Sequence, residues 1–346
     1  MTRSSIPKTI ILLVISIVFA VALAEALTRV TFMQWREFLS ERFMRTEVGG
    51  GIAALSVAKA NFDGYFAENN GDFRIRIQTN AMGLRNLEPT KAAQSRIWMV
   101  GDSITFGWGV AQSEILSSKT VDRLGRSAYN VASPGTDICG YRALLARMPK
   151  DISPTAVIIV LTIENDIRVY DCDANTVPLK EAPLATTISL SSLKQSLMKY
   201  SALYNFAALT LKKSPLIRDL LTGSGLINRG HTLHSHYPNS EIRHRTESAA
   251  TELSKLRQFL PAHTSFAVLL VPARFEVRDG NDFFHKVRNS MNNALNVRNI
   301  DVIDPIAEFR TAGFVATHFA HDGHWSAKGH EIAARHATAW LRRQGL

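Results

Sequence analysis

RIWMVGDSITFGWGV, residues 96–110, carries the first signal of an α/β fold. Apolar residues 97–100 follow Arg96, which predicts a buried strand at 96–100. Gly-Asp-Ser follows at 101–103, and Asp and Ser commonly begin turns and helices by bonding nearby backbone N–H groups. The sequence therefore predicts that Ser103 lies at the carboxyl end of a strand, either as a nucleophile or as an ordinary turn residue.

A regular alternation of strands and helices follows this stretch. The run AVIIVLT (156–162) is typical of a central parallel strand that is covered on both faces. Such alternation predicts an α/β sandwich around a parallel sheet. The expected strands are 96–100, 129–133, 156–162, 266–271 and 301–304, with a further strand at 73–80, and the expected helices include 113–125, 141–147 and 329–344.

The N-terminal segment TIILLVISIVFAVALAEAL predicts export. Residues 10–24 form a run without charged residues. This run is short for a membrane-spanning helix, which needs about 20 apolar residues. The same run is at the long end for a signal-peptide core of about 7–15 residues, and Ala22-Leu23-Ala24 offers a cleavage site. We favour a retained anchor because Ala26 and Leu27 extend the apolar stretch; a cleaved segment would give a secreted protein.

We divide the chain into a signal anchor or signal peptide (1–28), a connector and N-terminal extension (29–95), and a main domain (96–346). Residues 28–60 are predicted to be helical and amphipathic, because Trp35, Phe38, Leu39 and Phe43 recur at near-helical spacing. An insertion at about 171–245 shows no clear strand, but contains a helical stretch around 190–222 and the His-rich run HTLHSHYP. No carboxylate or cysteine cluster completes a metal site there, so a solvated loop is the preferred interpretation.

The composition limits the classes of partner that the chain is expected to bind. The 40 Lys and Arg residues exceed the 30 Asp and Glu residues, giving a formal net charge of +10. These basic residues are scattered and accompany no zinc-finger or RNA-binding signature, so we expect no nucleic acid partner. Attraction to an anionic membrane surface or an acidic polymer is the expected consequence. Cys139 and Cys172 could pair in an oxidising compartment, but two free thiols are slightly preferred.

Residues suited to serine chemistry follow successive strands in the order that such a site needs. Ser103 follows the first core strand, Gly135 the second and Asn165 the third, while Asp322 and His324 precede the last helix. A nucleophile needs a base, a group that orients the base, and donors for the oxyanion. In open α/β sheets these groups gather at the carboxyl ends of the strands. Each residue alone has an ordinary turn or capping role, but the ordered set favours catalysis.

In these residues the chain resembles the SGNH hydrolases, or GDSL esterases and lipases, of the membrane-anchored bacterial type. Four blocks match in order over about 96–340: Gly-Asp-Ser at 101–103, Gly135, Asn-Asp at 165–166, and the Asp322/His324 pair. The third block has Ile163 where the family pattern has Gly. The last block has only Gly323 between Asp and His, where the common pattern has two residues.

The resemblance implies a three-layer α/β/α sandwich with a flavodoxin-like parallel sheet. It implies that Ser103 is the nucleophile, His324 the base and Asp322 the residue that orients it. The oxyanion hole would consist of Ser103, Gly135 and Asn165, with no metal and no cofactor. We expect an exported esterase for an acylated small molecule or polysaccharide, on the periplasmic side of the membrane. An O-acyltransferase and a non-catalytic domain that binds an envelope polymer are the alternatives.

Overall fold

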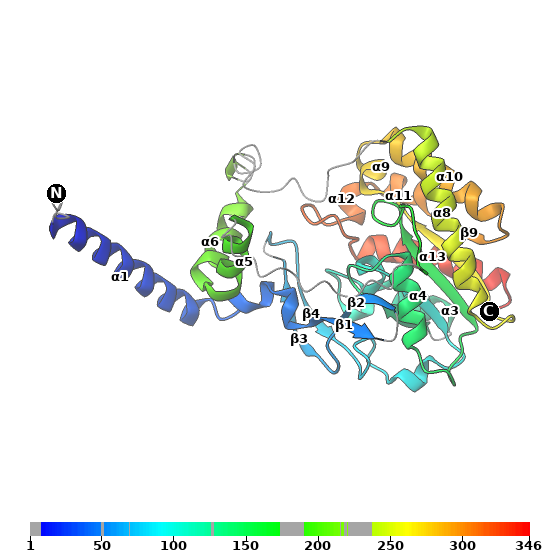
Figure 1. Cartoon of the computed structure of the whole chain (residues 1–346), viewed down its shortest axis with the longest axis horizontal. Coiled ribbons are helices and arrows are strands. Elements are labelled where there is room, and N and C mark those ends of the chain that lie inside the picture. The colour runs from blue at the N-terminus through cyan, green and yellow to red at the C-terminus, as the bar shows by residue number, and fades with distance from the viewer. Residues whose placement is uncertain are drawn as a thin grey trace. The chain divides into compact units, whose positions relative to one another are not determined.

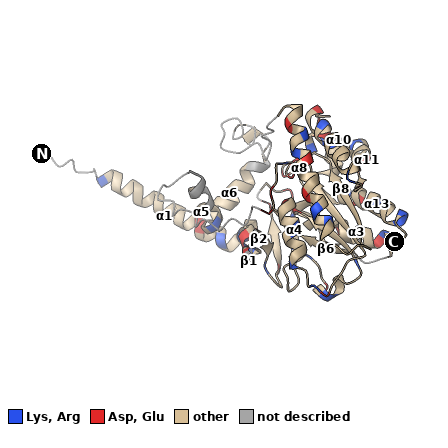
Figure 2. Cartoon of the chain, turned by 45° about the vertical axis from the view of Figure 1, so that its right-hand side comes forward, with Lys and Arg blue, Asp and Glu red and all other residues tan. Residues whose placement is uncertain are grey.

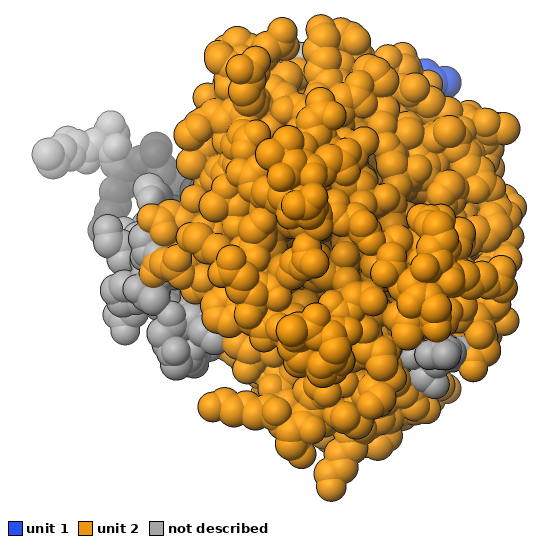
Figure 3. Space-filling model, turned by 90° about the vertical axis from the view of Figure 1, so that its right-hand side faces the viewer, with its two compact units in different colours: residues 1–42, 66–71, 184–229 blue, residues 43–65, 72–183, 230–346 orange. Residues whose placement is uncertain are grey.

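The computed structural model of the chain comprises two compact units, which are coloured separately in Figure 3. The smaller takes in residues 1–42, 66–71 and 184–229, and the larger takes in 43–65, 72–183 and 230–346. The five-stranded sheet and every predicted site residue belong to the larger unit. The residues that the structure describes are 8–49, 52–68, 70–125, 128–173, 190–214, 216, 217, 220 and 237–346.

The smaller unit is built on α1 (Lys8–Thr31), an apolar helix long enough to cross a membrane by length and composition, a test that signal sequences also pass. Near its end, the Glu25 carboxylate accepts hydrogen bonds from the N–H groups of Ala202 (2.8 Å) and Leu203 (3.0 Å). These residues begin α6 (Ala202–Lys213), which follows α5 (Leu190–Tyr200). Glu25 thus satisfies N–H groups that a helix leaves unpaired at its N-terminus.

The prediction of an amphipathic helix over 28–60 is wrong beyond the end of α1. After two short 3₁₀ turns, β1 (Met44–Gly49) and β2 (Ile52–Ala58) pair as an antiparallel hairpin. Leu55 and Val57 are buried on alternate positions of β2, the period of a strand. Three consecutive glycines at 49–51 favour a turn between two such strands, and spaced aromatic residues nearby had imitated a helical pattern. β3 (Asp63–Ala67) and β4 (Arg74–Gln78) form a second two-stranded sheet, and β4 confirms the strand expected at 73–80.

The central sheet of the larger unit is fully parallel (Figure 1). Its order is β6-β5-β7-β8-β9. With the five strands numbered in chain order, this is the 2-1-3-4-5 order of flavodoxin-like folds. All five predicted core strands are confirmed to within two residues at each end. Their bounds are β5 (Ile97–Gly101), β6 (Ala128–Ala132), β7 (Ala156–Thr162), β8 (Ser265–Val271) and β9 (Asp301–Ile303).

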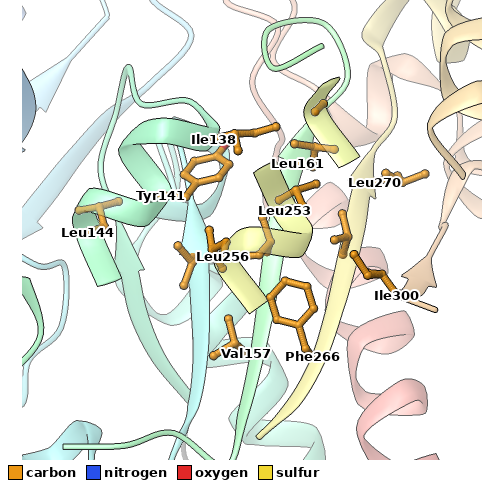
Figure 4. Packing of buried hydrophobic residues seen from close by; sticks show 14 of the residues in the cluster. Ile138, Tyr141, Leu144, Val157, Leu161, Leu253, Leu256, Phe266, Leu270 and Ile300 are labelled. Atoms are coloured by element: carbon orange, nitrogen blue, oxygen red, sulfur yellow. The ribbon is translucent and has the colours of Figure 1, made fainter. Parts of the chain in front are cut away.

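Helices cover both faces of this sheet, which makes three layers. Alternate residues of the strands point to opposite faces, so Val157 and Phe266 pack in one core while Ile158 and Ala267 pack in the other. Figure 4 shows the first core, where side chains of α4 and α8 lie over β7 and β8. The helices of this face are α4 (Ile138–Arg147), α8 (Asn239–Gln258) and α10 (Asp282–Asn296); those of the other are α3 (Leu116–Leu124) and α13 (Ala327–Arg343).

The insertion predicted at 171–245 is shorter than expected at its C-terminal end. α8 begins at Asn239 and packs on the sheet, so the last residues of that range belong to the core layers. Most of the run HTLHSHYP falls outside the described residues, and the described residues contain no cluster able to hold a metal ion. Figure 2 shows acidic and basic residues interspersed along α8 and α10, so the positive net charge is not concentrated on these helices.

The two cysteines form a disulfide, which corrects the slight preference for free thiols. Cys139 lies in the first turn of α4 and Cys172 in the loop after β7, with their Cα atoms 5.2 Å apart. Their sequence separation of 33 residues gave no sign of this proximity. The bond ties the loop that follows the Asn165 block to the helix that follows Gly135.

Candidate active site

Ser103 is the first residue of the short helix α2 (Ser103–Phe106), directly after β5. Asp102 caps this helix by accepting a hydrogen bond at 2.9 Å from the backbone N–H of Ile104. Its other oxygen accepts one from the Thr162 hydroxyl at the end of β7, also at 2.9 Å. Asp102 therefore provides the side-chain cap that the sequence could equally have assigned to Ser103.

The Ser103 side chain instead contacts a histidine from the far end of the chain. Its Oγ lies 2.8 Å from Nε2 of His324, and Nδ1 of the same ring lies 2.5 Å from Oδ2 of Asp322. With the ring proton on Nδ1, the carboxylate accepts from the imidazole and Nε2 accepts from the hydroxyl. The structure thus brings Ser103, His324 and Asp322 together in the order that activates a serine.

The short Asp-Gly-His segment reaches this geometry through a sharp turn before α13. Gly323 has a φ of +80°, a conformation that other residues rarely adopt. The N–H of Phe319 donates to the carbonyl of His324 at 2.8 Å and closes the turn. A Cβ on residue 323 would lie 2.3 Å from a guanidinium nitrogen of Arg274. The backbone conformation favours glycine at this position, and any larger residue would also displace the Arg274 side chain.

Two opposing effects set the pKa of His324. Burial lowers it, because a charged imidazolium loses its hydration. The charge of Asp322 and its hydrogen bond to the ring raise the pKa, with a smaller contribution from the charge of Asp102. The attraction prevails, so the pKa of His324 lies above its ordinary value. Asp322 therefore stabilises the protonated form of the His324 ring.

Gly135 and Asn165 line the same cavity of about 240 Å³ as Ser103 and His324. Gly135 has a φ of +77°, and a Cβ there would meet no atom within 4 Å. The backbone conformation therefore favours glycine at this position, although no neighbouring atom would clash with a side chain. Asn165 is exposed, and Ile163, which replaces the family glycine, is buried in the core instead of lining the cavity.

An ion pair in the cavity wall was missed from the sequence. Glu164, next to Asn165, accepts a hydrogen bond at 3.0 Å from Nε of Arg274, which follows β8, and another from its backbone N–H. Both side chains are nearly buried, with exposed fractions of 13% and 12%. Burial raises the pKa of Glu164, and the positive charge of Arg274 opposes this rise. Arg274 also donates to the carbonyl of Asp322 at 3.3 Å.

A buried arginine from the predicted connector supports the turn that carries Ser103. The guanidinium of Arg85 is fully buried and donates hydrogen bonds to the carbonyls of Phe106, Gly107 and Val110. Burial lowers the pKa of Arg85 to about 10, so it stays charged at neutral pH. These carbonyls come from α2 and the turn after it, where helical carbonyls lack intrahelical partners. The segment before residue 96 thus forms part of the site's support.

Comparisons with known proteins matched the chain to solved structures. No family model and no curated protein matches the chain. A lipolytic G-D-S-L family protein from Veillonella parvula is 15% identical over 72% of this chain and 99% of its own, with a TM-score of 0.39. The lipase/acylhydrolase from Enterococcus faecalis is 14% identical over 72% and 96%, with a TM-score of 0.41. A family two carbohydrate esterase from Clostridium thermocellum, solved with cellohexaose, is 12% identical over 72% and 64%, with a TM-score of 0.40.

These TM-scores lie below 0.5. The fold is therefore defined by the chain's own strand order and layers. The order 2-1-3-4-5 and the helices on both faces are the architecture that the four sequence blocks predicted. The chain has this three-layer α/β/α fold, and in its fold and its four blocks it is similar to the SGNH and GDSL hydrolases.

Proposed function

We propose that this chain is a serine esterase that hydrolyses carboxylic esters with short acyl groups, such as O-acetyl esters. The observation that carries the proposal is the pair of contacts on His324, to Ser103 Oγ at 2.8 Å and to Asp322 Oδ2 at 2.5 Å. The small cavity supports a short acyl group, because pockets for drug-sized ligands are about 300–1,000 Å³.

The reaction has two steps. Ser103 Oγ attacks the ester carbonyl while Nε2 of His324 takes the hydroxyl proton, and the negative oxygen is met by the N–H groups of Ser103 and Gly135 and the amide of Asn165. The bond to the alcohol breaks as His324 returns the proton to the leaving oxygen, which leaves an acyl-enzyme. Water then attacks the acyl group, His324 takes its proton, and the carboxylic acid departs as Ser103 Oγ regains a proton.

The test compares the wild type with Ser103→Ala on an activated acetyl ester, with and without sugar acceptors. We expect acetate as the product and a loss of at least about 10³-fold in kcat for the variant. An acetylated sugar would identify a transferase, and binding of an acylated polymer without turnover would identify a non-catalytic domain. Wild-type activity in the Ser103→Ala variant would refute the assignment of the nucleophile.

We also infer that the larger unit works outside the cytoplasm, on the periplasmic side of the membrane, attached through α1. Two features support this: the apolar helix, and the disulfide between Cys139 and Cys172, since stable disulfides are rare in reducing cytosol. A reporter that is active only in the cytoplasm, fused after Leu346, should give no signal. The mass of the mature chain decides separately between a retained anchor and a cleaved signal.

A further inference from the structure

Asp72, just before β4, contacts the catalytic loop although it precedes Asp322 by 250 residues in the sequence. Its Oδ2 accepts hydrogen bonds from the backbone N–H groups of His321 at 2.9 Å and Asp322 at 2.8 Å. Its Oδ1 lies 2.7 Å from Nδ1 of the His321 ring. The Asp72 side chain is only 6% exposed. A single carboxylate thus binds two consecutive backbone donors next to the predicted triad.

These contacts act on the residue whose side chain orients His324. The N–H of Asp322 is held by Asp72, and its carbonyl accepts a hydrogen bond from Arg274. Both faces of this peptide segment are therefore fixed by charged side chains, and hydrogen bonds to ionised groups are about twice as strong as neutral ones. The direction in which the Asp322 carboxylate points depends on how its own backbone is held.

The need for such support follows from the short Asp-Gly-His block. Gly323 lacks a side chain that could restrict its backbone, so the segment has more accessible conformations than another residue would allow. Only some of these bring Oδ2 of Asp322 to His324. Asp72 and Arg274 select one of them through hydrogen bonds from outside the segment, at its N–H side and its carbonyl side.

We propose that Asp72 is a positioning residue for the Ser103 site, holding the backbone of His321 and Asp322 so that the Asp322 carboxylate meets His324. This inference rests on the proposed function. In this role Asp72 acts through the backbone of Asp322, whose N–H it accepts at 2.8 Å. Because a displacement of about 1 Å at a catalytic group can cost about 10²-fold in rate, its loss should lower kcat more than it changes KM.

The activity test uses the full chain in detergent with four variants. Asp72→Ala removes both acceptors, and we expect kcat to fall about 10- to 100-fold with KM changed less than about threefold. Asp72→Asn keeps one acceptor oxygen, so its kcat should lie between those of Asp72→Ala and the wild type. His321→Ala removes the ring contact but keeps both backbone bonds, so its kcat should stay within about threefold of the wild type. Asp63→Asn is the matched control: Asp63 lies on β3 and pairs with Arg76 in an exposed ion pair.

A spectroscopic readout separates positioning from general stability. The proton between His324 Nδ1 and Asp322 should give a far-downfield proton NMR signal in the wild type, and Asp72→Ala should shift or abolish it while Asp63→Asn leaves it unchanged. This signal can be read even if no ester is turned over, so failure of the proposed function would not hide the result. If Asp72→Ala does not fold, as judged by its melting curve, Asp72→Asn decides alone. A kcat within twofold of the wild type and an unchanged signal would overturn the inference.

Discussion

Nδ1 of His324 lies 2.5 Å from the carboxylate of Asp322, although only one residue separates the two in the chain. In an extended segment, side chains two positions apart point to the same face but are separated by about 6–7 Å along the strand. The positive φ of Gly323 turns the chain between them, and the two side chains come within hydrogen-bond distance. The short spacing is therefore compatible with a Ser–His–Asp arrangement.

The acidic limb of the pH–rate profile should lie above the ordinary histidine pKa of about 6.5. The attraction of Asp322 raises the pKa of His324 against the effect of burial, and only the neutral ring can accept the Ser103 proton. Activity is thus lost as the pH falls through the raised pKa. Asp322→Asn should reduce kcat by about 10⁴-fold and move the remaining limb to lower pH. A profile of kcat/KM from pH 4 to 9 tests both statements. An Asn variant with near-normal rates would indicate a Ser–His dyad.

Replacing Gly323 should damage the site without unfolding the protein. In Gly323→Ala the new Cβ would meet Arg274 at 2.3 Å in a backbone conformation that alanine disfavours. We expect kcat to fall at least about tenfold, since either the strained turn beside His324 or the Arg274 side chain that holds it must shift. Gly313→Ala is a useful control, because Gly313 also has a positive φ but its Cβ would meet nothing within 4 Å. Equal losses in the two variants would show that strain alone matters and that packing against Arg274 does not.

The ion pair between Glu164 and Arg274 should show strong coupling in a double-mutant cycle. Arg274→Met leaves the Glu164 carboxylate nearly buried without its charged partner, which typically costs about 3–5 kcal/mol in the free energy of unfolding. Adding Glu164→Gln should restore a large part of that loss, because the uncompensated charge is then gone. Urea denaturation of both single variants and the double variant measures the coupling. Additive losses would mean that the two side chains do not stabilise each other.

Stability should fall in mild acid because of buried neutral histidines. Burial lowers the pKa of His330 to about 3, and does the same to His318. In the unfolded chain, both histidines have the ordinary pKa of about 6.5. The unfolded state therefore binds more protons between these values, and stability is lost as the pH falls from 6.5 towards 3, by up to about 1.4 kcal/mol per pH unit for each histidine.

His330→Phe tests this dependence, because it removes one of the two titrating rings and keeps an aromatic side chain against Trp325. The free energy of unfolding, measured in urea at pH 7, 6, 5 and 4, should fall less steeply for the variant than for the wild type. Parallel curves would show that His330 does not titrate on unfolding in this range.

The sheet and the main site residues could be predicted because their signals are local. Apolar runs such as 156–162 mark buried strands wherever they occur, and Ser103, Gly135 and Asn165 each follow such a run directly. Parallel strands bring their carboxyl ends to one edge, so position after a strand already implies proximity. The rule does not place His324, which follows no core strand directly, and its meeting with Ser103 was expected from the family resemblance.

The remainder depends on contacts between distant segments, which no local pattern records. Asp72 and Arg274 reach the Asp322 segment from different parts of the chain, and Cys139 meets Cys172 only because α4 and the loop after β7 are neighbours. The β1–β2 hairpin was missed for a different reason. Aromatic residues at near-helical spacing outweighed the triple glycine at 49–51, which was the better signal.

The buried guanidinium of Arg85 has a consequence for how the protein opens. If the turn at 106–110 opened alone, Arg85 would lose its hydrogen bonds to Phe106, Gly107 and Val110 together, and a buried charge would be left with too few acceptors. Local fluctuations that expose only the turn after Ser103 are therefore suppressed. In hydrogen exchange, the amides from 104 to 110 and those flanking Arg85 should become accessible together, as one cooperative unit, at a free energy close to that of global unfolding.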